Sequence, residues 1–138
     1  MTFEHRIDAL RDLIAAKEPL PETFSRLKTF PWDSDRTLVD LERSDVIRVL
    51  RRYLQERLSA EKCGEWADAI EARDDVGFEP QHTDLLKRVI FDIANPELSG
   101  QLSHEAARDW ITLLENAGHT EANPGSVSGD GDTPSDGP

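Results

Sequence analysis

Two groups of carboxylates beside an aromatic residue are the strongest candidates for a functional site in this sequence. The first group is Asp33 and Asp35 next to Trp32. The second group surrounds Phe78 and consists of Glu71, Asp74, Asp75 and Glu79. A carboxylate pair works as general acid and base only when burial or close juxtaposition raises the pKa of one member. A protein-binding surface requires only that the carboxylates be exposed.

Acidic groups around an aromatic side chain are typical of an anchor for a basic partner. The charge speeds encounter, and the aromatic ring supplies a desolvated contact. We therefore predict that these eight residues bind a partner: Trp32, Asp33, Asp35, Glu71, Asp74, Asp75, Phe78 and Glu79. The alternative is that the acids are solvated helix-end charges while both aromatic residues cover the core. Gly77, within the second group, predicts a tight turn.

The remaining reactive residue types form no catalytic or metal-binding motif. His5, His82, His104 and His119 lie in four separate segments without the spacing of metal ligands. No glycine-rich phosphate loop or nucleophile elbow occurs, and Cys63 falls on the apolar side of its helix, which predicts an inert core thiol. We predict no catalytic residue, no metal and no cofactor. An enzyme whose site assembles from scattered Asp, Glu, His and Arg remains an alternative.

The apolar residues recur at helical spacing and predict an all-α fold, a compact bundle of about five to six helices spanning residues 1–118. Helices are expected near 2–17, 21–30, 44–58, 59–73, 83–95 and 103–118. The predicted N-caps are Thr2 and Ser44, the fourth and last helices are expected to start at Ser59 and Ser103, and Gly118 is expected just beyond the last helix. Residues 31–43 lose the period and predict an ordered loop whose aliphatic residues reach the core. We expect no strand.

The third and fourth predicted helices should form a tight hairpin around Ser59. Across it, Arg48, Arg51, Arg52 and Arg57 are expected to form ion pairs with Glu61, Glu65, Asp68 and Glu71. Tyr53 and Trp66 are predicted core residues.

The charge balance limits the classes of partner. With 28 Asp and Glu against 16 Lys and Arg, the formal net charge is −12. Such a protein repels nucleic-acid phosphates and anionic membranes and attracts basic proteins. One cysteine, no signal peptide and no apolar span predict a cytoplasmic protein. Residues 119–138, rich in Gly, Ser, Asp and Pro, predict a disordered acidic tail.

Two stretches resemble a known family. VLRRYLQERLSAEKCGEWADAI and LSHEAARDWITLL are similar in layout to the colicin-D-type immunity proteins, and the resemblance extends from Ser44 to Leu114. It implies a small acidic helical bundle that blocks a cognate bacterial toxin, often a ribonuclease, by placing carboxylates in its basic active site. It implies no numbered site residue in this sequence.

The sequence thus predicts a non-enzymatic immunity or inhibitor protein that binds a basic bacterial toxin. The main alternative is a structural or adaptor domain that associates with itself or with another protein through an apolar helix face, a homodimer included.

Overall fold

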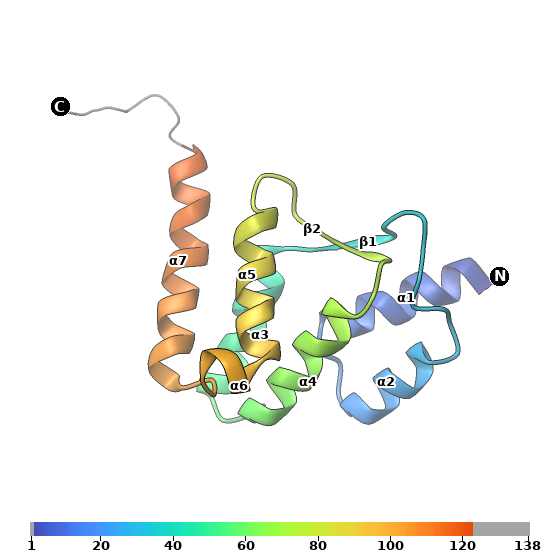
Figure 1. The fold of residues 1–138 in the computed structure, drawn as a ribbon, viewed down its shortest axis with the longest axis horizontal. Helices are drawn as coiled ribbons and strands as arrows, with labels where there is room; N and C mark the ends of the chain where they lie inside the picture. Colours follow the sequence, from blue (N-terminus) through green and yellow to red (C-terminus); the bar gives the residue numbers. More distant parts are fainter. Residues whose placement is uncertain (1, 123–138) are drawn as a thin grey trace.

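The computed structural model describes residues 2–122, which form seven helices and two short strands (Figure 1). The predicted mainly helical fold is confirmed. The predicted acidic tail lies outside the described residues from position 123 onward. Among residues 2–122, no helix has both the length and the apolar character needed to cross a membrane.

The first two helices, α1 (Thr2–Ile14) and α2 (Leu20–Leu27), pack against each other at one side of the molecule. Pro21 lies in the first turn of α2, where its missing N–H leaves no helical hydrogen bond unmade. α2 buries Leu20 and Leu27, whereas Phe24 stays half-buried and faces the neighbouring helix α4 across a groove.

The structure contains two short strands that the sequence analysis did not predict. β1 (Val39–Leu41) and β2 (Val76–Phe78) pair in parallel, with Val39 opposite Val76 and Leu41 opposite Phe78. The expectation of no strand is therefore wrong. Each strand has only three residues, too few for an alternating pattern to stand out. The expected burial of Leu41 is confirmed.

Gly77 lies within β2, so the tight turn predicted there is wrong. A Cβ atom at Gly77 would be 2.5 Å from a carboxylate oxygen of Asp40 and 3.0 Å from the Thr37 methyl group. The missing side chain therefore allows β1 and the residues before it to approach β2 closely.

α3 (Arg43–Leu54) and α4 (Ala60–Glu71) follow β1. The predicted start of α4 at Ser59 is confirmed, and the Ser59 hydroxyl caps the helix by accepting a hydrogen bond from the Lys62 N–H at 3.1 Å. The cap predicted for α3 at Ser44 is wrong. Glu42 occupies that position, and its N–H donates to Asp45 at 2.8 Å.

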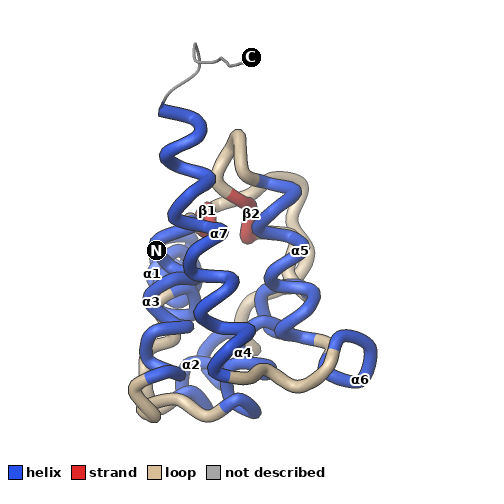
Figure 2. The backbone as a smooth tube through the Cα atoms, turned by 90° about the vertical axis from the view of Figure 1, so that its left-hand side faces the viewer, coloured by secondary structure: helices blue, strands red, loops and turns tan. Residues whose placement is uncertain are grey.

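α5 (Thr83–Ala94) ends before Asn95 and Pro96, as predicted. A short additional helix, α6 (Pro96–Ser99), then projects from one end of the bundle (Figure 2). α7 (His104–Ala122) begins after Ser103, whose hydroxyl accepts from the Ala106 N–H at 3.1 Å. The helix end predicted at Gly118 is wrong, because α7 continues to Ala122.

The predicted ion pairs between α3 and α4 are also wrong. α3 packs mainly against α7, and α4 packs mainly against α5. Arg51 pairs with Glu115 of α7 at 2.7 Å, Arg52 pairs with Glu18 at 3.5 Å, and Arg48 pairs with a carboxylate of its own helix. The carboxylates of α4 are consequently left on its outward face.

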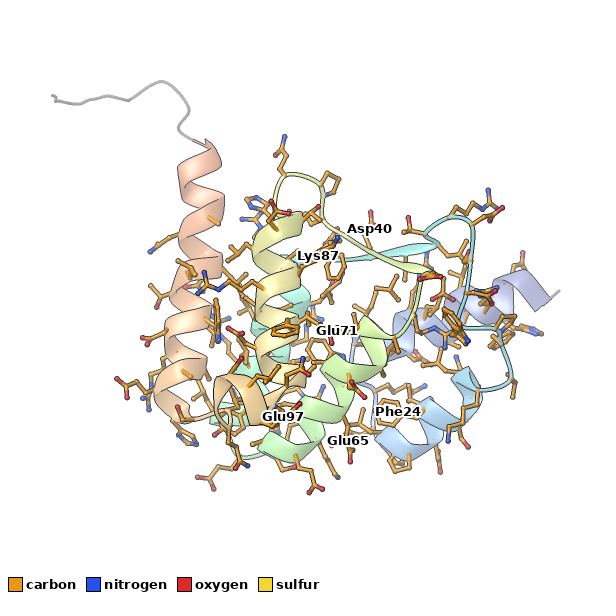
Figure 3. The ribbon with its side chains drawn as sticks, in the orientation of Figure 1. Phe24, Asp40, Glu65, Glu71, Lys87 and Glu97 are labelled. Atoms are coloured by element: carbon orange, nitrogen blue, oxygen red, sulfur yellow. The ribbon has the colours of Figure 1, made fainter. Side chains whose placement is uncertain are left out.

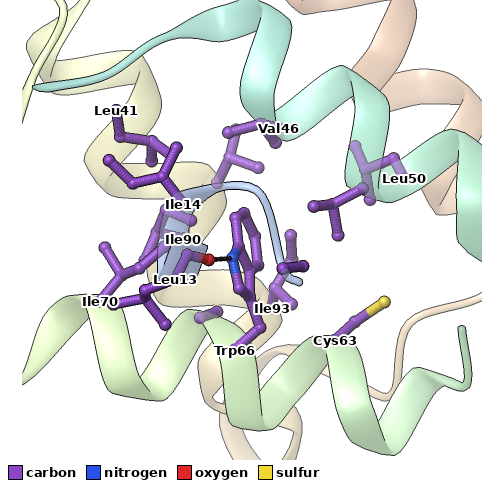
Figure 4. Packing of buried hydrophobic residues seen from close by; sticks show 14 of the residues in the cluster. Leu13, Ile14, Leu41, Val46, Leu50, Cys63, Trp66, Ile70, Ile90 and Ile93 are labelled. Carbon is purple, nitrogen blue, oxygen red and sulfur yellow. Dashed lines mark hydrogen bonds between the residues drawn. The ribbon is translucent and has the colours of Figure 1, made fainter. Parts of the chain in front are cut away.

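The core is centred on Trp66 of α4, which is fully buried as predicted (Figure 4). Its indole N–H donates to the Leu13 carbonyl at the end of α1 at 2.7 Å, so this buried polar group is satisfied. Cys63 is buried on the same helix, and burial raises the pKa of its thiol to about 11. The predicted core placement of Cys63 is confirmed.

Candidate protein-binding surface

Asp75 is the centre of an ionic cluster that joins three parts of the chain. Its side chain is fully buried, and it accepts hydrogen bonds from Nε of Arg6 and Nε of Arg73, each at 2.9 Å. Two guanidinium groups therefore neutralise one buried carboxylate, which would be costly to bury alone. Its backbone carbonyl accepts from the N–H groups of Leu38 at 2.7 Å and Val39 at 3.3 Å. We call Arg6, Arg73 and Asp75 the Asp75 clamp.

The Asp75 clamp also fixes the backbone around Trp32. The Arg6 guanidinium donates to the carbonyls of Pro31 at 3.1 Å and Asp33 at 3.0 Å, and the second arginine of the clamp donates to Pro31 at 2.6 Å. The Asp74 N–H donates to the Trp32 carbonyl at 3.0 Å. Three successive carbonyls are thus bound by groups from the first helix and from the segment after α4.

The Trp32 side chain is 61% exposed although its backbone is held in this way. It lines a groove of about 570 Å³ between α2 and α4, which we call the Trp32 groove. Its apolar lining also includes Phe24, and its α4 rim carries Glu65 and Asp68. Figure 3 labels Phe24 and Glu65 on these two helices. An exposed aromatic side chain therefore lines one groove together with apolar side chains and two carboxylates.

The outward face of α4 carries an acidic stripe, which consists of Glu61, Glu65 and Asp68. Their spacing places them on one helix face, and all three are exposed. None takes part in the ion pairs formed among residues 2–122. Together with Glu97 they line a second groove of about 600 Å³ between α4 and the end of α5, the acidic groove. The sequence did not indicate this stripe as a binding surface, because its carboxylates were expected to form ion pairs with the arginines of α3. Their spacing on one helix face was nevertheless visible.

The structure brings part of both predicted carboxylate groups together. Trp32, Asp33 and Asp35 are exposed, as their predicted role requires, and Asp74 is exposed beside Trp32. The exposure predicted for Asp75 is wrong, because two arginines hold it in the interior. A carboxylate without accessible surface contacts no partner, so Asp75 can act only by holding the loop.

Glu71 and Phe78 lie elsewhere, in a groove of about 510 Å³ on the other side of α4. Lys87 and Arg88 share this lining, and the Lys87 ammonium lies 5.9 Å from the centre of the Phe78 ring. Desolvation raises the pKa of Glu71, while its hydrogen bond with the Asn95 side chain opposes that shift. This surface has mixed charge and does not continue the acidic stripe.

Glu79 is occupied by a structural ion pair at the far end of β2. Its two carboxylate oxygens accept from Arg43 at 3.0 and 2.9 Å, and this hydrogen bonding lowers the pKa of Glu79. Its N–H donates to the Leu41 carbonyl at 2.8 Å. The alternative that both aromatic residues cover the core holds for Phe78, which packs against the core, and is wrong for Trp32.

No cluster of three or more metal-ligating His, Cys, Asp or Glu residues was found within residues 2–122. His104 packs edge-on against Tyr53, with ring centres 5.1 Å apart.

Comparisons of the chain with protein-family models, with curated proteins and with solved structures found no match.

Proposed function

We propose that this chain is a non-enzymatic immunity or inhibitor protein that blocks a basic bacterial toxin in the cytoplasm. The observation that supports this function best is the acidic stripe of Glu61, Glu65 and Asp68. These carboxylates face outward without an ion-pair partner among the described residues, in a chain of net charge −12.

The placement of three arginines also supports this function. Arg6, Arg43 and Arg73 form ion pairs in which their side chains are 22% exposed or less. Their charge is directed into the protein, whereas the acidic stripe is directed into solvent. The resulting negative field favours encounter with a basic protein and opposes the approach of nucleic-acid phosphates.

The resemblance to colicin-D-type immunity proteins points the same way. The resembling residues 44–114 include all of α4 and therefore the whole acidic stripe. A stripe of exposed carboxylates has the chemistry needed to cover a basic ribonuclease active site.

The test is capture of the toxin by the immobilised full-length chain from a bacterial cytosol, followed by a growth assay. A basic protein should bind at low salt and be released near 1 M salt, where the Debye length is about 3 Å. Expressed alone, that protein should stop bacterial growth, and co-expression with this chain should restore growth. A captured protein that is not toxic, or whose toxicity persists on co-expression, would contradict the proposal.

A matched pair of charge reversals locates the effect. Changing Glu61, Glu65 and Asp68 to Lys should abolish protection. The control changes Asp84, Glu105 and Asp109 to Lys, which alters the net charge equally at exposed positions outside the stripe. Equal loss of protection in both variants would show that net charge, and not the stripe, is responsible.

The adaptor alternative is favoured by a different observation. Phe91, Leu98 and Leu113 are large apolar side chains exposed by 43%, 70% and 48%. Self-association through these residues would give a dimer in sedimentation that high salt does not dissociate. A monomer at every salt concentration would argue against this alternative.

A further inference from the structure

We infer that the Trp32 groove is a docking site for the apolar face of a basic amphipathic helix on a partner protein. This inference rests on the proposed function and specifies the part of the partner that is recognised. It follows from the shape of the groove, from the way Trp32 is held, and from the charges at its rim.

The shape suits a helix. The groove lies between two helices, α2 and α4, and its apolar lining includes Phe24 and Ala69. A groove of this kind accepts an amphipathic helix whose apolar residues recur at three and four positions. The groove of about 570 Å³ has room for several such side chains.

The way Trp32 is held prepares it for binding. Tryptophan is among the residues most enriched at the energetic centre of interfaces, and here 61% of its surface is still open to solvent. The Asp75 clamp and the Asp74 N–H fix the carbonyls of residues 31–33 before any partner arrives. A partner therefore does not have to order this loop, which removes one of the costs of association.

The rim charges select the sign of the partner. Glu65 and Asp68 line the groove from α4, and Asp33, outside the lining itself, is exposed next to Trp32. Two cations also line the groove: Lys28 at the end of α2, and Arg73, whose charge is offset by its ion pair with the buried Asp75. The surplus of carboxylates favours Lys and Arg on the polar flanks of the docked helix. The exposed Phe91 lies among Lys87 and Arg88 and lacks this complementarity.

The test uses a synthetic peptide of about five helical turns, or about 18 residues, with Leu on one face and Lys on the other. Calorimetric titration into the full-length chain should show binding. Trp32→Ala should weaken it by at least about tenfold, as expected for a central anchor. Leu113→Ala, which removes an apolar side chain of α7 that is 48% exposed and lies outside the groove, should leave the affinity unchanged.

Two further peptides separate shape from charge. A version with Glu in place of Lys should not bind, and a version with Ala in place of Leu should bind weakly and only at low salt. Equal affinity of the Leu and Lys peptide for the wild type and Trp32→Ala would overturn the inference, as would absence of binding. Since Trp32 is exposed, the variant should keep the wild-type melting temperature, which checks that it folds.

The two proposals fail separately. If the captured toxin binds Trp32→Ala as tightly as it binds the wild type, the groove is the wrong surface and the inhibitor function stands. If no toxin is captured while the peptide binds in a Trp32-dependent way, the groove is a binding site and the inhibitor function is wrong.

Discussion

The two grooves along α4 have similar volumes and share two carboxylates, yet they differ in their other lining side chains and in the loop that borders them. Glu65 and Asp68 line both the Trp32 groove and the acidic groove. The Trp32 groove adds two aromatic side chains and a loop fixed by the Asp75 clamp. The acidic groove adds Glu97 and the connection from α5 to α6, without an aromatic side chain.

This difference separates the attraction of a partner by charge from its anchoring by an apolar side chain. Long-range attraction by Glu65 and Asp68 acts on both grooves, because these two carboxylates line both. Only the Trp32 groove combines that attraction with a large apolar side chain whose backbone is already ordered. Encounter should therefore depend on α4 as a whole, and residence of the partner should depend on the Trp32 groove.

The largest effect is expected from removing the centre of the clamp. Asp75→Ala leaves two arginines close together without their carboxylate and should lower the free energy of unfolding by about 3 kcal/mol. Urea denaturation measures this, and hydrogen exchange at the Leu38 and Val39 amides should accelerate. Asp74→Ala is the control, because Asp74 is exposed and contributes its backbone N–H, which the variant keeps. Equal destabilisation of both variants would contradict the clamp.

The next effect concerns the strand pair behind the clamp. Gly77→Ala should cost about 1 to 3 kcal/mol, since its Cβ meets Asp40 and Thr37. Gly64→Ala is the counterpart in the acidic groove, where the nearest atom outside the helix's own backbone is a carbonyl oxygen at 3.4 Å. It should be neutral or stabilise the helix by up to about 1 kcal/mol. Thermal denaturation of both variants decides whether only the clamp side is tightly packed.

A smaller effect is expected at the far end of β2. The lowered pKa of Glu79 means that its ion pair stabilises the fold above its unfolded pKa, near 4.5, and that this contribution is lost as pH falls through the folded value. Glu79→Gln should therefore reduce stability at neutral pH by about 1 kcal/mol or less. Denaturation across a pH series should show the wild type and the variant converging in acid. If the free energies of unfolding of the wild type and the variant differ by the same amount at every pH, the ionised Glu79 is not the cause of the difference.

The smallest effect tests the two grooves directly. Lys28 lines only the Trp32 groove, and Glu97 lines only the acidic groove. Lys28→Glu should tighten binding of the basic helical peptide by about two- to threefold, which corresponds to about 0.5 kcal/mol. Glu97→Lys should change the affinity for this peptide less. If calorimetric titration shows a larger change for Glu97→Lys than for Lys28→Glu, the binding surface is the acidic groove.

Some local features of the fold were predictable from the sequence, whereas the cap expected at Ser44 and the helix end expected at Gly118 were wrong. The starts of α4 at Ser59 and of α7 at Ser103, and the end of α5 before Pro96, depend on residues within one helical turn. Asp74 and Asp75 show that local sequence alone does not determine which residues are buried. They are adjacent and identical, yet one is exposed and the other fully buried, because Arg6 and Arg73 meet only in the folded chain.

The candidate site was predictable in part for the same reason. Trp32 and its neighbouring carboxylates were recognisable from residue type, and their exposure agrees with that choice. The acidic stripe was visible as spacing on α4, but its freedom from ion pairs depended on which helix packs beside α3. That packing is set by contacts between distant segments, which no local pattern encodes.

The clamp also determines when the Trp32 loop can become ordered. Arg6 and Asp75 are separated by 69 positions, so their pairing requires closure of a long loop of chain. During synthesis, α1 and the Trp32 segment leave the ribosome well before Asp75 does. The loop cannot take its final shape until synthesis has passed Asp75. Trp32 should therefore reach its final setting late in folding, so that the proposed docking site forms only after the helical core has begun to assemble.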